Sequence, residues 1–211
     1  MKYFTSILVL AFLFCSAPIF GQTEFAIRGG WNLTNFSGKV TYFGIARESV
    51  KIGASMTIPM WNRLSLQFGG DYVSKGADSF IDYKIHVDYI EFSGLATVTL
   101  IVPRRLPSFS ILIGPTVAFK VRTQGTDGLA RRYWRDQFEF KTLDFGIAGG
   151  IGMQMAISDA MILKAELLWT EGIRSINKTA SYDPNFNAET SIKNRGISVC
   201  VGFGFPYGRR N

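Results

Sequence analysis

The chain has 211 residues, which suits one domain or one barrel with a complete core. Hydrophobic residues make up 47%, which excludes a disordered chain, while charged residues reach only 18% and aromatic residues 14%. This composition indicates an exterior that partly faces something other than water. The net charge of +7 is scattered along the chain, whereas a nucleic-acid binder would concentrate it on one element or face.

Residues 1–21 have the features of a secretory signal peptide. The positively charged start is followed by the apolar run Ile7–Phe14, and Gly21 is a small residue at the expected cleavage point. The run is too short to be a transmembrane helix. We therefore expect cleavage near Gly21 and a mature chain of residues 22–211.

The mature chain alternates between runs of period-two hydrophobicity and polar or glycine-containing connections. This pattern, with many β-branched and aromatic residues, predicts strands. Eight runs are recognised: Phe25–Leu33, Val50–Ile58, Leu64–Val73, Tyr89–Ile101, Phe109–Val121, Leu143–Ile157, Met161–Trp169 and Ile197–Phe205.

The connections alternate in length. Those after the second, fourth and sixth runs are short, and those that start from Thr34, Ser74, Arg122 and Thr170 are expected to be long. Outer-membrane barrels have short periplasmic turns and long extracellular loops in this order. The predicted fold is therefore all-β, an eight-stranded antiparallel up-and-down transmembrane β-barrel.

Period two gives each strand an apolar face and a small or polar face. A membrane barrel turns the apolar face toward lipid, and a soluble barrel turns it inward. In the membrane interpretation the lumen holds four cations and four anions: Arg28, Lys51, Lys120, Lys164, Asp71, Glu91, Asp144 and Glu166. An eight-stranded barrel is just wide enough to be filled by side chains, and unpaired buried charges are costly, so we expect interior salt bridges that close the lumen.

Aromatic residues favour the membrane interpretation, because two groups of them are expected at the two membrane interfaces. One group falls near the short-turn end and comprises Phe25, Trp61, Phe109, Phe203 and Phe205. The other falls near the long-loop end and comprises Trp31, Tyr72, Phe119 and Trp169.

The segment Phe25–Phe36, with the sequence FAIRGGWNLTNF, resembles the G-x-K-G-G-x-N-x-S-N-F opening of the outer-membrane β-barrel domain family that includes the PorT-like proteins. Ile113-Gly114-Pro115 resembles the mid-barrel Gly-Pro of that family, and the likeness covers nearly the whole mature chain. The chain departs from the family pattern at its C-terminal end. Many outer-membrane barrels finish on an aromatic residue, whereas here Pro206–Asn211 follow Phe205. The resemblance implies the fold and the location but no single activity, because one fold hosts several functions.

No catalytic, cofactor or metal site is recognised. The one histidine, His86, is followed by Asp88, but no serine or further acid is clearly placed beside them. Cys15 falls inside the signal peptide, which leaves Cys200 alone without a disulfide or a cysteine metal cluster.

Binding is expected in the loops, where one basic and aromatic cluster stands out. It comprises Arg131, Arg132, Tyr133, Trp134 and Arg135. The leading interpretation is a monomeric outer-membrane barrel, not an enzyme, with a structural, interaction or secretion-accessory role. Its expected partners are outer-membrane lipid, lipopolysaccharide and other envelope proteins. Two alternatives stay open: a soluble extracytoplasmic barrel that binds a small apolar ligand, and a barrel enzyme acting on lipid, for which His86→Ala would abolish an activity.

Overall fold

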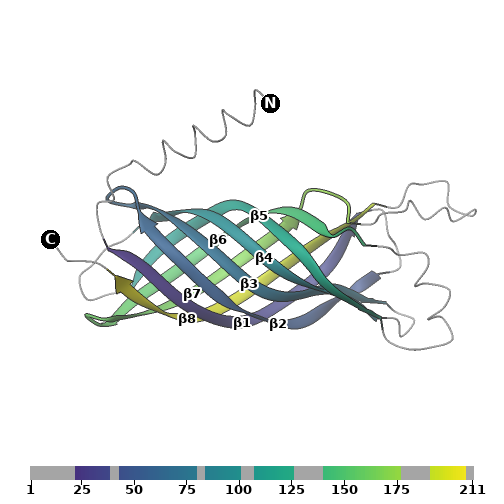
Figure 1. Cartoon of the computed structure of the whole chain (residues 1–211), viewed down its shortest axis with the longest axis horizontal. Helices are drawn as coiled ribbons and strands as arrows, with labels where there is room; N and C mark the ends of the chain where they lie inside the picture. The colour runs from purple at the N-terminus through teal and green to yellow at the C-terminus, as the bar shows by residue number, and fades with distance from the viewer. Residues whose placement is uncertain are drawn as a thin grey trace, which may run out of the picture.

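The computed structural model describes residues 22–38, 43–79, 84–100, 107–125, 140–176 and 191–207. Eight antiparallel strands form a closed barrel, in which each strand pairs with its sequence neighbours and the last pairs with the first (Figure 1). The predicted all-β, eight-stranded, up-and-down architecture is confirmed. The strands are β1 (Thr23–Gly38), β2 (Phe43–Pro59), β3 (Leu64–Ser79), β4 (Lys84–Thr99), β5 (Ser108–Gly125), β6 (Leu143–Ser158), β7 (Met161–Gly172) and β8 (Ile192–Tyr207).

Most strands extend beyond the predicted runs at the end expected to carry the long loops. β1 continues to Gly38 before β2 begins at Phe43, and β3 continues to Ser79 before β4 begins at Lys84. The expectation of long connections starting at Thr34 and Ser74 was therefore wrong. The outer faces become polar there, so period-two hydrophobicity ends although backbone pairing continues.

The apolar face of the sheet lies on the outside. Val50, Ile52 and Ile113 are each more than 60% exposed, while the alternate positions point into the barrel. A water-soluble barrel would have the opposite arrangement, so this surface is suited to contact with lipid. None of the described residues belongs to a helix long and apolar enough to cross a membrane.

The aromatic residues of the two groups expected at the membrane interfaces all point outward. Phe25 pairs with Phe205 in the register between β1 and β8, near the short-turn end. Every member of both groups is at least 43% exposed, as found for Phe25, Trp31, Trp61, Tyr72, Phe109, Phe119, Trp169, Phe203 and Phe205. The prediction that they face away from the lumen is confirmed.

Pro115 lies at an interruption of the ladder between β4 and β5. Paired residues stop at Ser93↔Thr116 and resume at Ala96↔Ile113 with the register unchanged. Proline has no N–H to donate, which accounts for a gap at this point. Gly114 makes the local backbone approach possible, because a Cβ there would lie 2.0 Å from the carbonyl oxygen of Gly94.

Candidate functional site: the barrel lumen

A chain of ion pairs runs along the middle of the lumen, and Arg28 of β1 is the cation nearest its short-turn end. The Nε of Arg28 donates to Oδ1 of Asp71 at 2.9 Å, and its Nη2 donates to Oδ2 of the same carboxylate at 2.7 Å. Its Nη1 donates to Oε2 of Glu166 at 2.7 Å. One guanidinium therefore joins β1 to both β3 and β7 through the interior.

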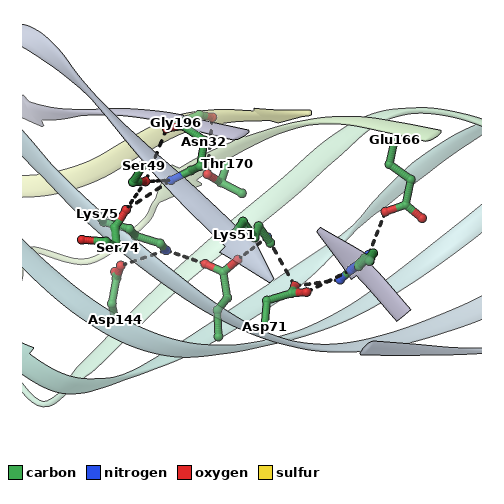
Figure 2. A network of polar contacts seen from close by, with 12 residues as sticks. Asn32, Ser49, Lys51, Asp71, Ser74, Lys75, Asp144, Glu166, Thr170 and Gly196 are labelled. Atoms are coloured by element: carbon green, nitrogen blue, oxygen red, sulfur yellow. Dashed lines mark hydrogen bonds and ion pairs between the residues drawn. The ribbon is translucent and has the colours of Figure 1, made fainter. Parts of the chain in front are cut away.

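The chain continues toward the loop end through Lys51 and Lys75 (Figure 2). The Nζ of Lys51 lies 3.4 Å from Oδ2 of Asp71 and 3.0 Å from Oε1 of Glu91. The Nζ of Lys75 contacts Oε2 of Glu91 at 2.5 Å and lies 3.7 Å from Oδ2 of Asp144. These side chains are at most 7% exposed, so water screens the contacts little.

Toward the short-turn end, a second pair joins β1 to β7. The Nζ of Lys164 lies 2.8 Å from Oε1 of Glu24 and donates to the hydroxyl of Thr57 at 3.3 Å. Gln67 donates to Oε1 of Glu166 at 2.8 Å, which leaves Oε2 for Arg28.

The structure places seven of the eight predicted interior charges in buried positions: Arg28, Lys51, Asp71, Glu91, Asp144, Lys164 and Glu166. The eighth, Lys120, is half-buried and donates through Nζ to the backbone oxygen of Phe140 at 2.7 Å. Sequence reasoning missed Glu24 and Lys75, which continue the alternation of Arg28 and Asp71 just outside the predicted runs. The two additions keep the balance, one anion and one cation.

Glycines make room for these long side chains. A Cβ at Gly69 would collide with the guanidinium of Arg28, and a Cβ at Gly204 would collide with the carboxylate of Glu24. A side chain at either position would displace one end of an ion pair.

An apolar cluster occupies the lumen at the loop end. Its members are Phe36, Val73, Ala77, Val87, Tyr89, Ala118, Phe140, Ile176 and Ile192, all at most 8% exposed. Phe140 and Ile176 come from segments between strands and are fixed by backbone bonds, Lys141 N to Ile176 O at 2.7 Å and Ile176 N to Ile192 O at 2.8 Å. We call this group the loop-end plug.

A polar cavity of about 180 Å³ lies in the short-turn half of the lumen. Its walls include Glu24, Gln67, Thr97, Lys164 and Glu166. From the short-turn end, the lumen therefore contains a polar cavity, then the ion pairs, then the loop-end plug.

His86 and Ser93 both lie on β4, seven positions apart in a strand whose register with β3 is unbroken. Residues an odd number apart point to opposite faces of a strand, so these two side chains do not form a hydrolytic pair. Among the described residues, no group of three or more His, Cys, Asp and Glu is placed to hold a metal ion. The predicted loop cluster Arg131–Arg135 lies outside the described residues, as does the predicted signal peptide.

Comparisons with known proteins bear on the fold. No family model matches the chain, and no curated protein matches it. Among solved structures, the outer membrane protein OprG from Pseudomonas aeruginosa is similar with a TM-score of 0.55 and 15% identity, over 90% of this chain and 98% of that chain. Neisserial surface protein A gives 0.47 and 12% over 87% and 97%, and outer membrane protein W from E. coli gives 0.47 and 9% over 89% and 98%. The likeness to OprG shows that this chain has the fold of an eight-stranded outer-membrane β-barrel.

Proposed function

We propose that the chain is an integral outer-membrane β-barrel protein with a non-conducting lumen and a structural, interaction or secretion-accessory role. The observation that carries the proposal is the filled lumen, where the ion-pair chain from Glu166 to Asp144 is followed by the loop-end plug. The outward apolar face and the fold shared with OprG support the outer-membrane location. The segment Phe25–Phe36 supports kinship with the PorT-like proteins.

The function is exerted at the ends of the barrel and not by transport through it. On this proposal the protein is a monomer and not an enzyme, and it contacts lipopolysaccharide or envelope proteins through its loop end. The described residues there include the exposed cations Arg122, Arg174 and Arg195. Together with Arg131, Arg132 and Arg135 they suit the phosphates of lipopolysaccharide.

The triple change of Arg131, Arg132 and Arg135 to alanine should reduce the amount of lipopolysaccharide that copurifies with the protein. An unchanged amount would contradict the proposal that lipopolysaccharide is a partner.

The closed lumen is tested by planar-bilayer recording. The wild-type protein should show no large, steady conductance, because the ion pairs and the loop-end plug occupy the path. The double variant Lys51→Ala/Glu91→Ala removes one cation and one anion from mid-lumen and should increase the frequency of brief current steps. The matched control is Glu171→Ala/Arg195→Ala, which removes a pair at 2.6 Å that includes the exposed Arg195.

A steady wild-type conductance would overturn the closed lumen. The location is tested separately by membrane fractionation together with heat-modifiable gel mobility. The protein should sediment with the outer membrane and migrate differently when it is not boiled. Recovery in the soluble periplasm would overturn the membrane assignment.

A further inference from the structure

The polar cavity at the short-turn end has the size of a small-molecule site. A volume of about 180 Å³ corresponds to about six water molecules at roughly 30 Å³ each, or to one small organic molecule. Seven strands contribute to its walls, from Glu24 of β1 to Glu166 of β7, so the barrel scaffold fixes its shape.

The walls of the cavity offer more hydrogen-bond acceptors than donors, which favours a ligand that donates hydrogen bonds, as an ammonium ion does. The charged residues that line the cavity are Glu24, Lys164 and Glu166, two anions and one cation. Lys164 already contacts Glu24, and Glu166 already accepts from Arg28 and Gln67. Each carboxylate oxygen can accept more than one hydrogen bond, whereas the single ammonium of Lys164 is largely used, so acceptor capacity exceeds donor capacity.

Thr97 gives independent evidence of a polar guest. Its side chain lines the cavity, the residue is 8% exposed, and its Oγ1 has no hydrogen-bond partner among the described residues. Buried hydroxyls are almost always paired, so one left unpaired in a cavity wall indicates a missing partner. The hydroxyls of Ser65 and Ser110 line the same space.

Access comes from the short-turn end. The cavity is lined on this side by Gln22, which directly precedes β1, and by Pro59 and Thr99, the last residues of β2 and β4. The opposite direction is blocked by the Arg28–Asp71–Lys51 contacts and then by the loop-end plug.

From this geometry we infer that the cavity is a binding site for a small organic ammonium ion that carries a hydroxyl group, the chemistry of an amino alcohol. The ammonium lies between the carboxylates of Glu24 and Glu166, and the hydroxyl pairs with Thr97. The guest enters from the short-turn side and does not cross the barrel. This site goes beyond the proposed function, which assigns no ligand to the lumen.

The test uses the full barrel in nanodiscs of phosphatidylcholine, so that no lipid supplies a primary amine. Ethanolamine is the probe. Two analogues serve as controls: ethylene glycol, which lacks the amine, and ethylamine, which lacks the hydroxyl. The methyl NMR signals of Thr97 and Thr57 should shift saturably with ethanolamine, with an affinity of about 1 mM. Both analogues should bind more weakly than ethanolamine.

Two variants test whether Thr97 and Glu24 contact the bound ethanolamine. Thr97→Val keeps the shape of the side chain and should weaken ethanolamine binding about threefold to tenfold, as expected for one lost hydrogen bond. Glu24→Gln should weaken it about tenfold, because the lost contact is charge-assisted. The matched controls Thr123→Val and Glu48→Gln change exposed residues at the loop end and should bind as the wild type does.

Unboiled gel mobility verifies that each variant is folded. Equal binding of ethylene glycol and ethanolamine would overturn the inference, as would unchanged binding by Thr97→Val. An absence of saturable shifts would show that the cavity holds only water. None of these outcomes affects the closed lumen, which the conductance recordings test.

Discussion

Arg28 holds two carboxylates at once from a buried position. Its planar guanidinium binds Asp71 through two parallel hydrogen bonds and has a third donor left for Glu166. Lysine has one compact ammonium and does not match a carboxylate in this way. Three strands are thereby coupled through one side chain.

Arg28→Met should destabilise the barrel by about 3–5 kcal/mol, because it leaves two buried carboxylates without their main cation. Urea unfolding in lipid vesicles, followed by tryptophan fluorescence, measures the change. Arg195→Met is the matched control, since Arg195 pairs with Glu171 on the exposed rim, where such a pair contributes about 1 kcal/mol or less. Equal losses in the two variants would contradict a special role of the buried contacts.

The side-chain alternation of the strands is readable from the sequence, but the partners of each side chain are not. Alternation places Arg28 and Asp71 on the non-lipid face, and extending it by two or four residues would also have found Lys75 and Glu24. That Arg28 meets Glu166, 138 positions away, depends on how the strands are staggered around the barrel. The cavity depends on which interior positions lie at the same height, which no single strand specifies.

At the scale of a strand, β5 shows how a local sequence sets the pairing. Gly114 brings its backbone against Gly94 on β4, and Pro115 leaves a gap in the ladder that the surrounding register bridges. The Gly-Pro pair is tolerated because paired residues on both sides hold the strands together.

Gly114→Ala should cost about 1–3 kcal/mol, because the new Cβ meets backbone and forces β4 and β5 apart. The matched control is Gly29→Ala, where the nearest atom to a new Cβ, the carbonyl oxygen of Lys51, is 3.9 Å away. The midpoints of urea unfolding should differ in this order. A loss at Gly29 as large as that at Gly114 would show that glycine is needed for another reason.

Strand lengths were predicted less well than strand number. Hydrophobic alternation predicts the part of a strand that faces lipid and is silent about its polar continuation. The pairs Thr34↔Arg47 and Asp78↔Lys84 belong to such continuations. The polar composition of these continuations predicts loops, although backbone hydrogen bonds to the neighbouring strand keep the chain extended.

The molecule as a whole encloses its ion pairs and the loop-end plug and presents an apolar outer face. Val201 lies near the middle of β8 and is 51% exposed, whereas Tyr207 lies at its short-turn end and is 73% exposed. In water these two positions would tolerate a charge alike, but in a bilayer they differ in depth.

Val201→Arg should cost about 2–4 kcal/mol and Tyr207→Arg about 0–1 kcal/mol, because the penalty for a cation on the lipid face falls toward the interface. Urea unfolding in vesicles compares the two variants with the wild type. If both substitutions cost the same, the apolar exterior of the barrel is not lipid-facing.

The contact between Arg28 and Glu166 also bears on how the barrel is assembled. Arg28 belongs to the first strand and Glu166 to the seventh, so their meeting depends on the seam at which β8 joins β1. An unsealed sheet that entered the bilayer would present its charged face to the hydrocarbon. The contacts of Lys51 and Lys75 join strands β2 to β6 and do not cross the seam, whereas Glu166 and Lys164 meet Arg28 and Glu24 only across it. Closure of the barrel therefore completes the pairing of the interior charges of β7.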